Sequence, residues 1–445
     1  FDLYQMGDIQ EMGRNNSENV VKMANQWQAD ETACIIYTSG TGGTPKGVML
    51  SHKAILHNCA GAEDALGEIG LGEETFLSFL PLSHSYEHTA GQFFPISIGA
   101  EIYYAESVES LSNNMLEAKP TIMTAVPRLY EMLHQRIAAG VKKTGGSKEK
   151  LFNKALFLGQ KHLAGESLGI GEKIQDKVLD KLVRNKVRAR FGGRLKALVS
   201  GGAPLNPDIA IFFSALGLRL LQGYGQTETA PVVSVNRPSL VKLHTVGPPL
   251  LNTEVKIGED GEILVRGDLL MQGYWGNEEA TRATIIDGWV HTGDIGEFDE
   301  DGYLIITDRK KDIIVNSGGD NLAPQRIEGI ICMEPEISQA MVYGDKHPHI
   351  VALLVPDDEW LKAWAVEAGK PPLLADAAQD EDLLGALRPA INQINAKLSN
   401  IEKVRRFIIA DEPFTIDNAQ MTPTMKVRRH KLKEVYGERL ELLYS

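Results

Sequence analysis

One stretch of the chain combines the residue types that bind phosphate: Tyr37-Thr38-Ser39-Gly40-Thr41-Gly42-Gly43-Thr44-Pro45-Lys46-Gly47. It follows an apolar segment and joins small residues and hydroxyl groups to one cation. Backbone N–H groups in such a loop can bind an anion, with the hydroxyls and the lysine adding donors. It is not a Walker A loop, because Gly-Lys-Ser/Thr is absent and Pro45 precedes Lys46. The alternative is a Gly/Ser-rich turn at a strand end, which needs neither the hydroxyls nor the closing Lys-Gly.

Two further loops also follow apolar segments. Ser200-Gly201-Gly202-Ala203-Pro204-Leu205 would let a flat group lie against the backbone, next to the start of a predicted helix. Gly223-Tyr224-Gly225-Gln226-Thr227-Glu228 supplies an aromatic face for a base, a hydroxyl for a phosphate and a carboxylate for Mg²⁺. The structural alternative for Glu228 is a helix cap.

The elements expected around these loops indicate how they are held. Apolar segments alternate with helical patterns, which predicts a parallel α/β sheet with crossover helices. The expected strands are 33–38, 75–80, 100–104, 121–126, 195–200 and 218–222, and the expected helices include 127–139 and 207–216. Ligands of open α/β sheets bind at the carboxyl ends of strands. We therefore expect the three loops to meet at one sheet edge and to bind a nucleotide.

The pattern changes after residue 250. Short segments at 254–257, 262–265 and 303–306, separated by Asp-Gly turns, predict a β-rich subdomain. Beyond the charged run 308–312, a helix at 324–333, strands at 340–343 and 351–355 and helices up to 398 predict a small α+β domain. We expect long helices over 147–190 and a surface loop at 373–382.

Composition excludes several classes of protein. The 445 residues predict two or three domains, and the formal net charge of −13 argues against non-specific nucleic-acid binding. No stretch is long and apolar enough for a membrane span. Cys34, Cys59 and Cys332 show no C-x-x-C spacing, which favours buried thiols in a reducing compartment. The basic cluster Lys181, Arg184, Lys186, Arg188 and Arg190 is interpreted as a solvated helix face, with a membrane-surface or acid-binding patch as the alternative.

Together with these loops, three later segments resemble the signature motifs of the adenylate-forming superfamily, which includes acyl-CoA synthetases, adenylation domains of peptide synthetases and firefly luciferase. Trp289-Val290-His291-Thr292-Gly293-Asp294 is similar to its Thr-Gly-Asp motif, and Asp308-Arg309-Lys310-Lys311-Asp312 to its hinge motif. Met421-Thr422-Pro423-Thr424-Met425-Lys426 is similar to its C-terminal lysine motif. The chain departs at Gly42, where the family usually has Thr, and we expect a modest effect on ATP affinity.

The resemblance implies an α/β fold in two parts. Residues 1–310 would form a large adenylate-forming domain of sheets with flanking helices and a β-rich subdomain, with its N-terminal part missing from this chain. Residues 311–445 would form a small, mobile α+β C-terminal domain. A hinge at Lys311 would let the small domain rotate between two half-reactions.

The resemblance also implies roles for matching residues. Lys426, Glu228, Thr227 and His84 would be catalytic. Lys426 would lie against the α-phosphate and the acyl oxygen, stabilising charge as pyrophosphate leaves. His84 would lie beside the acyl carboxylate, and a structural histidine is the alternative. Glu228, with Thr41 or Thr38 nearby, would hold Mg²⁺.

The remaining implied positions bind nucleotide or CoA. Asp294 and Arg309 would bind the ribose, and Tyr224 would stack on adenine, flanked by Gly202 and Ala203. Gly318 and Gly319 would line the path of the CoA pantetheine. The other implied positions are Thr38, Ser39, Gly40, Thr41, Gly43, Thr44, Lys46, Gln222, Gly223, Gly225 and Lys311.

The implied activity is that of a long-chain fatty acid–CoA ligase. ATP would activate a fatty acid to acyl-AMP with release of pyrophosphate, and CoA would then accept the acyl group and release AMP. Acyl-pocket positions are expected partly in 92–99 and 217–225. Two alternatives stay open: a fatty acyl-AMP ligase that loads a carrier protein, and a non-catalytic nucleotide-binding fragment. We expect ATP, Mg²⁺ and CoA as cofactors, no nucleic-acid partner and a cytoplasmic location, with peripheral contact at the inner face of the membrane and a homodimer left open.

Overall fold

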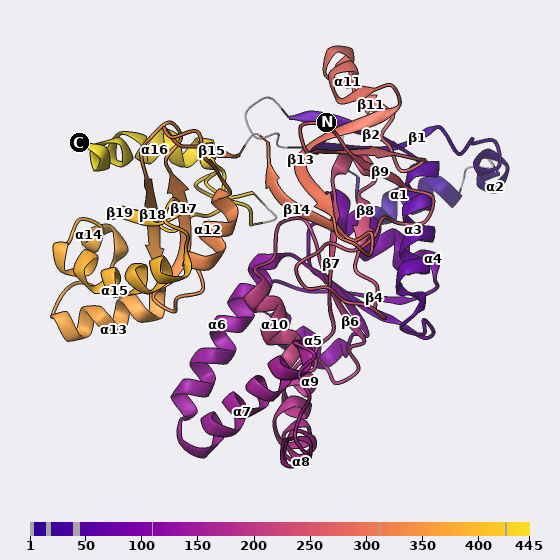
Figure 1. Cartoon of the computed structure of the whole chain (residues 1–445). Helices are drawn as coiled ribbons and strands as arrows, with labels where there is room; N and C mark the ends of the chain where they lie inside the picture. Colours follow the sequence, from indigo (N-terminus) through magenta and orange to yellow (C-terminus); the bar gives the residue numbers. More distant parts are fainter. Residues whose placement is uncertain (1–3, 15–18, 39–44, 109, 311, 423–424) are drawn as a thin grey trace.

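The computed structural model describes residues 4–14, 19–38, 45–108, 110–310, 312–422 and 425–445. Figure 1 shows a large body, coloured indigo to orange, beside a smaller body that carries the C-terminus. Two short helices, α1 (Met6–Arg14) and α2 (Val20–Ala24), precede the first strand. No helix among these residues is long and apolar enough to cross a bilayer.

A six-stranded sheet with the order β4-β3-β5-β6-β7-β8 forms the centre of the large body. Its strands are β3 (Thr75–Ser78), β4 (Glu101–Tyr104), β5 (Ile122–Ala125), β6 (Ala197–Ser200), β7 (Leu220–Gly225) and β8 (Val232–Val235). All neighbours are parallel except β7 and β8. Five of the six strands expected from the sequence lie here, and β3 and β5 are buried along their whole length, as parallel strands covered on both faces are.

Helices cover this sheet. They include α3 (His52–Gly67), the π-helical segment η1 (Glu87–Phe93), α4 (Phe94–Ser97), α5 (Leu111–Ala118), α6 (Pro127–Thr144) and α10 (Pro207–Ala215). One core cluster joins α3 and α4 to the sheet through Ile55, Phe94 and Leu221. A second cluster joins α5, α6 and α10 to it through Met115, Tyr130 and Phe213. The sheet is thus held between two apolar layers.

The first predicted strand does not belong to this sheet. β1 (Thr32–Thr38) pairs antiparallel with β2 (Lys46–Ser51), and β11 (Gly273–Tyr274) completes a separate three-stranded sheet. Thr38 is paired with Lys46, so the loop between them closes a hairpin. The placement of this strand in the parallel sheet was therefore wrong. The loop between Thr38 and Lys46 is too short for a parallel crossover, which needs a dozen or more residues, so the two strands pair as a hairpin.

The predicted long helices form a helical extension, defined here as residues 127–190, which projects from the sheet in Figure 1. After α6 it contains α7 (Gly146–Leu163), α8 (Ile170–Leu179), the π-helical turn η2 (Asp180–Arg184) and α9 (Asn185–Arg190). Arg184 is buried, and its guanidinium donates to the carbonyls of Ala155 and Ala215 at 2.8 and 2.9 Å. The interpretation of Arg184 as part of a solvated face was therefore wrong.

The β-rich subdomain follows the expected pattern. A five-stranded sheet contains β9 (Glu254–Ile257), β10 (Glu262–Arg266), β12 (Ile285–Ile286), β13 (Trp289–Phe298) and β14 (Leu304–Arg309). The short helix α11 (Glu278–Thr284) precedes β12. β13 is the longest strand of this sheet and pairs with β14 so that Asp294 lies opposite Arg309.

The small body is α+β, as expected. Its strands are β15 (Ile314–Val315), β16 (Asn321–Leu322), β17 (Ile337–Tyr343), β18 (Ile350–Pro356) and β19 (Val404–Ile409). Its helices are α12 (Pro324–Ile331), α13 (Asp358–Ala368), α14 (Leu374–Ala377), α15 (Glu381–Lys397) and α16 (Arg429–Glu441). The loop predicted at 373–382 was partly wrong, because α14 lies in it and Ala377 and Ala378 are packed in the core.

Two side-chain amides of the large body hold the small one. Gln135 of α6 donates to the carbonyl of Cys332 at 3.2 Å and to that of Ile337 at 3.5 Å. Asn206, just before α10, donates to the carbonyl of Gly329 in α12 at 3.1 Å. Cys34, Cys59 and Cys332 are free thiols, and the last two are buried.

Close packing of α7 on α10 gives a stability prediction. A Cβ on Gly159 would lie 2.3 Å from the carbonyl oxygen of Ala215, so Gly159→Ala must separate the two helices. We expect a loss of about 1–3 kcal/mol in the free energy of unfolding, the usual cost of overpacking. Gly140→Ala is the control, because a Cβ there meets nothing within 4 Å and alanine favours the helix by about 1 kcal/mol. Urea unfolding measures both, and equal effects would contradict the packing argument.

Candidate active site

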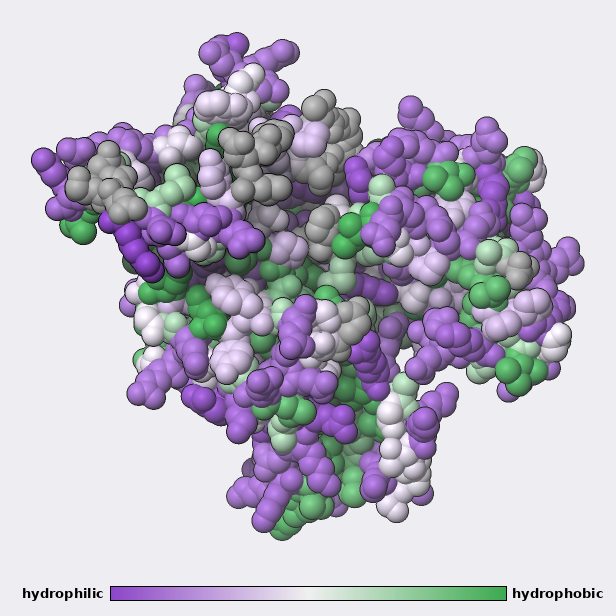
Figure 2. All heavy atoms as spheres, turned by 180° about the vertical axis from the view of Figure 1, so that it is seen from behind, coloured by the Kyte–Doolittle hydropathy of each residue, from purple (hydrophilic) through white to green (hydrophobic). Residues whose placement is uncertain are grey.

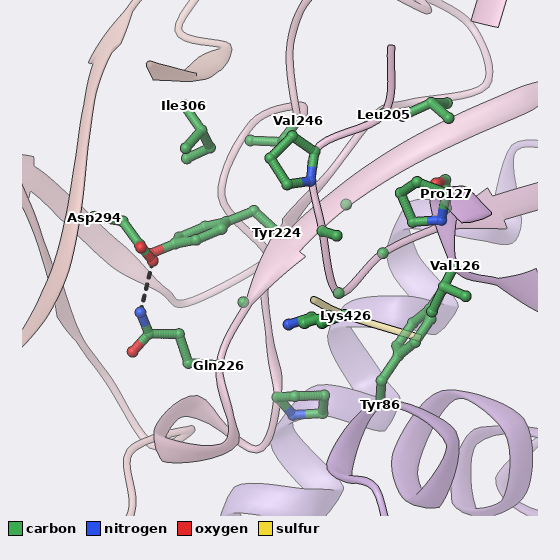
Figure 3. Close-up of a pocket in the computed structure, with 18 of the residues that line it drawn as sticks. Tyr86, Val126, Pro127, Leu205, Tyr224, Gln226, Val246, Asp294, Ile306 and Lys426 are labelled. Carbon is green, nitrogen blue, oxygen red and sulfur yellow. Dashed lines mark hydrogen bonds between the residues drawn. The ribbon is translucent and has the colours of Figure 1, made fainter. Parts of the chain in front are cut away.

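The carboxylate of Asp294 is the point where several elements meet. The hydroxyl of Tyr224 in β7 donates to its Oδ2 at 2.7 Å, and the amide of Gln226 donates to the same oxygen at 2.6 Å. Nε of Arg309 in β14 donates to Oδ1 at 3.2 Å. Figure 3 shows Tyr224 and Gln226 directed at Asp294 from one side of the pocket. Burial and the charge of Asp294 raise the pKa of Tyr224, which keeps this hydroxyl a donor.

The turn that carries Asp294 is fixed by its own hydrogen bonds. Gly293 has φ +70°, a conformation that favours glycine, and its N–H donates to Glu262 Oε1 at 2.7 Å. The hydroxyl of Thr292 donates to the carbonyl of Ile263 at 2.7 Å and accepts the N–H of Asp294 at 3.1 Å. These contacts to β10 set the direction of the Asp294 side chain.

A cation and a carboxylate meet near the mouth of the β1–β2 hairpin. Nζ of Lys46 lies 4.7 Å from the ring centroid of Tyr274, and the hydroxyl of Tyr274 donates to Glu228 Oε1 at 2.8 Å. The adjacent Thr227 shares a 3.0 Å hydrogen bond with Ser85. The hairpin therefore presents a positive charge beside one carboxylate and several hydroxyls, a combination that suits a phosphate chain with a metal ion.

Asn58 of α3 supports the segment behind Glu228. It is fully buried, donates to the carbonyl of Thr229 at 3.2 Å and accepts the N–H of Val232 at 2.6 Å. These two bonds join α3 to the turn between η3 (Thr227–Thr229) and β8. Buried polar groups of this kind are almost always paired, and here the pairing fixes the path of the loop.

Lys426 of the small body lies in the same pocket as Asp294 and Tyr86 (Figure 3). The backbone N–H of Lys426 donates to the hydroxyl of Thr422 at 3.0 Å. Burial and the nearby Arg309 lower the pKa of Lys426 to about 8, although Asp294 and Asp312 oppose the shift. The lysine is thus a cation near neutral pH in a site where charge is poorly solvated, and an incoming anion would stabilise its protonated form.

His84 is the neutral partner of this lysine. Burial and the charge of Lys426 lower the pKa of His84 to about 4. Nδ1 accepts the N–H of Tyr86 at 3.2 Å, which places the ring proton on Nε2. Next to it, Glu87 is fully buried and accepts the hydroxyl of Thr124 at 2.9 Å, anchoring the turn to β5.

The 200–205 loop packs closely against this turn. A Cβ on Gly201 would lie 2.9 Å from the ring of Tyr86, so only glycine lets the two segments approach in this way. Gly202 has φ +82°. Both glycines line the cleft, which supports the expectation of a flat surface there.

Most of these groups line one cleft of about 1470 Å³, whereas Asn58 and Glu87 support it from behind. The candidates that line it are Thr38, Lys46, His84, Gly202, Ala203, Gln222, Gly223, Tyr224, Gly225, Thr227, Glu228, Asp294, Arg309 and Lys426. Ser39, Gly40, Thr41, Gly43, Thr44 and Lys311 lie outside the described residues. Gly318 and Gly319 are not brought to the cleft; they lie in the β15–β16 turn, where Asn316 Oδ1 accepts the N–H of Gly318 at 2.9 Å. The roles assigned to all these residues remain predictions.

The cleft continues into an apolar arm between α3, α4 and the sheet. Ala62, Leu66, Phe76, Phe94 and Leu250 line it. Phe94 and residues 222–225 fall in the two ranges expected for an acyl pocket, whereas the contribution of α3 was missed. The sequence of α3 is that of an ordinary amphipathic core helix, and no local signal marks it as the wall of a pocket.

Two cleft residues were also missed as functional candidates. Gln226 belongs to the third predicted loop, and its amide, two residues after Tyr224, could have been predicted as a hydrogen-bond donor in the site. Tyr274 is 46 residues from its partner Glu228, and nothing in its local sequence marks it.

Comparisons with known proteins agree with this geometry. A family model described as AMP-binding enzyme matches residues 3–275, and one described as AMP-binding enzyme C-terminal domain matches residues 311–445. The long-chain-fatty-acid–CoA ligase FadD15 of Mycobacterium bovis is 36% identical over 426 residues, which is 94% of this chain and 70% of that protein. The peroxisomal long chain acyl-CoA synthetase 6 of Arabidopsis thaliana is 34% identical, with 94% of this chain and 61% of that protein covered.

Among solved structures, the adenylation domain of a carboxylate reductase from Mycobacterium chelonae matches with a TM-score of 0.73 and 25% identity. The match covers 94% of this chain and 60% of that one. O-succinylbenzoate coenzyme A synthetase from Bacillus subtilis, solved with AMP, matches with a TM-score of 0.61 at 22% identity and so shows the fold alone.

The coupling of His84 to Lys426 is testable without any substrate. Lys426→Met removes the charge that helps to lower the pKa of His84, so that pKa should rise from about 4 while burial keeps it below 6.5. An NMR titration of the ring signals measures this shift. Lys433→Met, on the exposed side of α16, is the control and should leave the titration unchanged. A pKa of His84 that does not move in Lys426→Met would contradict the geometry.

Proposed function

The chain belongs to the AMP-binding enzyme family, and from that membership we propose that it is a long-chain fatty acid–CoA ligase. ATP would activate a fatty acid to acyl-AMP with release of pyrophosphate, and CoA would then take the acyl group and release AMP. The observation that carries the proposal is one cleft that joins the Asp294 cluster and Lys426 to an apolar arm. Relatives named as long-chain ligases support the same substrate class.

Positioning and charge account for the chemistry that these residues would perform. The fatty acid carboxylate is itself the nucleophile at the α-phosphorus, so the protein supplies no covalent intermediate. Lys426, as a cation in a poorly solvated site, would stabilise the charge that develops on the phosphate oxygens. His84 would donate a hydrogen bond from Nε2 to the fatty acid carboxylate and hold that carboxylate in line with the α-phosphorus. Because its pKa is about 4, it makes this contact as a neutral ring.

Asp294 can bind ribose only after a local rearrangement. A carboxylate offers about four acceptor positions, and Tyr224, Gln226 and Arg309 already use three here. One ribose hydroxyl fits the remaining position, and the second needs one of the present donors to withdraw. We assign that movement to Gln226, because its amide also has the carbonyl of Thr292 as a partner at 2.7 Å.

The described residues fit an Mg²⁺ ion that is held mainly by nucleotide phosphates, with one carboxylate from the protein. Within the described part of the chain there is no cluster of three or more His, Cys, Asp or Glu side chains that would enclose a metal. Mg²⁺ bound to nucleotide phosphates, however, commonly takes only one or two protein carboxylates. Glu228, which lines the cleft beside Lys46, would be that carboxylate. The ion would neutralise the phosphates and orient pyrophosphate as a leaving group.

CoA as acceptor is proposed together with a movement of the small domain, residues 311–445, relative to residues 1–310. Lys426 now lies in the cleft, whereas Gly318 and Gly319 lie away from it. Thioester formation would exchange these two segments. Transfer to a carrier protein is the competing outcome. A cytoplasmic location, a homodimer and a peripheral membrane position stay predictions.

Removing the Lys426 charge should separate the two half-reactions. In Lys426→Ala we expect acyl-AMP formation to fall by two or more orders of magnitude, because about 3–4 kcal/mol of charge stabilisation is lost. Thioester formation from supplied acyl-AMP should be largely retained. Lys433→Ala, in the same domain, should leave both steps near wild-type rates. Adenylation that survives in Lys426→Ala would show that this lysine has another role.

The substrate assignment is tested by pyrophosphate release with acids from acetate to oleate, with and without CoA. We expect the highest kcat/KM with long acids, since the apolar arm contributes binding only to them. We also expect AMP release to require CoA. Acyl-AMP that accumulates in the presence of CoA would favour the carrier-protein alternative, and no pyrophosphate with any acid would overturn the proposed function.

A further inference from the structure

The residues of α8 (Ile170–Leu179) and of η2 behind it fall into rows with a period of four. Acidic residues form one row, lysines a second row and apolar residues a third. The rows are Glu172, Asp176 and Asp180; Lys173, Lys177 and Lys181; and Ile170, Ile174, Val178 and Leu182. Residues four apart in a helix share a face, so each row runs along the helix axis and on into η2.

The acidic row is fully used inside the protein. Glu172 pairs with Lys161 of α7 at 3.1 Å, Asp176 with Arg184 at 2.7 Å and Asp180 with Arg188 at 2.8 Å. Leu179, on the same inner side, is 3% exposed and packs with Ala155 and Leu158 of α7. These contacts fix the orientation of α8 and leave its other side facing outward.

The lysine row and the apolar row are both on that outer side. The side chains of Lys173, Lys177 and Lys181 are exposed, and none of the three ammonium groups makes an ion pair or hydrogen bond with another described residue. The apolar row is exposed by 83%, 62%, 50% and 46% from Ile170 to Leu182. Each of the first three apolar residues is followed three positions later by a lysine, so the two rows touch along their length. Figure 2 shows green and purple side chains together at this lower end of the molecule.

The surrounding charge has the same sign. The helical extension, residues 127–190, contains fifteen Lys and Arg and six Asp and Glu. The whole chain has 46 Lys and Arg and 59 Asp and Glu. In a protein with a net charge of −13, positive charge is therefore concentrated around this exposed apolar row. Long-range attraction of this part to an anionic surface follows, because the negative charge lies elsewhere.

We propose that α8 is a docking surface for a bilayer that contains anionic lipids. The helix lies in the plane of the interface, with Ile170, Ile174, Val178 and Leu182 at the acyl boundary. Lys173, Lys177 and Lys181 extend their chains along these residues and place their ammonium groups at the lipid phosphates. The acidic row stays on the protein side, where its charges are already paired.

A second copy of the chain does not fit the same face. A twofold contact brings a surface against itself, so the unpaired lysine rows would face one another. α8 has ten residues, a length of about 15 Å, which is too short to supply the roughly 1,000 Å² that a stable interface buries. The combination of unpaired cations and exposed apolar groups selects a partner that is both anionic and apolar.

The experiment is vesicle co-sedimentation of the full chain without ATP, CoA or fatty acid. Vesicles of phosphatidylcholine with phosphatidylglycerol are compared with vesicles of phosphatidylcholine alone. Two triple variants are tested: Ile170→Ser with Ile174→Ser and Val178→Ser, and Lys173→Gln with Lys177→Gln and Lys181→Gln. The matched control is Val366→Ser with Ile416→Ser and Val435→Ser, three residues that are 82%, 52% and 58% exposed on the small body.

We expect the wild-type chain and the control to bind the anionic vesicles and to bind phosphatidylcholine far less. The lysine variant should weaken partitioning on the order of a hundredfold, since each lysine near an anionic surface contributes roughly fivefold. The apolar variant should weaken it at least about tenfold. All changed positions are exposed, so unchanged thermal unfolding checks that the variants fold.

Binding of the wild-type chain that ignores lipid charge, or variants that bind as tightly as the control, would overturn the proposal. A dimer in light scattering that only the apolar variant dissociates, without vesicle binding, would instead identify the face as a contact between copies. The vesicle experiment contains no substrate, so its result does not depend on whether the chain is an active ligase, and the two proposals can fail separately.

Discussion

The pairing of the Asp294 carboxylate is the constraint on which the site depends. A buried charge is tolerated only when donors surround it, and here the donors come from separate elements. Tyr224 arrives from the six-stranded sheet and Arg309 from the β-rich sheet, so two sheets must keep a fixed relation for this one group to be satisfied. The β13–β14 register, which places Asp294 opposite Arg309, is the structural expression of that requirement.

From this carboxylate a chain of electrostatic influence crosses the cleft. Arg309 pairs with Asp294 and also lowers the pKa of Lys426, and Lys426 in turn lowers the pKa of His84. The three groups belong to β14, the segment before α16 and the turn after β3. The protonation of His84 is therefore linked to that of Lys426, with the small body supplying the connecting charge.

Residue patterns predicted much of this arrangement. The parallel strands, the β-rich hairpins and the second loop are where periodicity and turn residues placed them, because each is a local property of the chain. The third loop begins later than predicted, because β7 continues to Gly225 and pairs there with β8. The error over β1 arose because an apolar strand carries no mark of the sheet it joins; only the short loop to Lys46 distinguishes a hairpin from a crossover. Tyr274 and the α3 side of the apolar arm escaped prediction for the opposite reason, since their partners are distant in sequence. Gly318 lies away from the cleft here, and its predicted place on the pantetheine path after rotation of the small domain stays a prediction, because it depends on how the two bodies are oriented.

Among the residues that the structure describes, the side-chain hydrogen bonds from the large body to the small one are made by amides to main-chain carbonyls. Gln135 and Asn206 contact Cys332, Ile337 and Gly329 only through backbone oxygen. Such contacts recognise where a helix end lies and are indifferent to which side chains it carries. These bonds alone leave the side chains of that helix end unconstrained while the two bodies meet in one register, although Met333 beyond it packs against the core of the large body. Neutral bonds of this kind also exchange readily with water, each at a net cost of about 1 kcal/mol, so the same register is easily left.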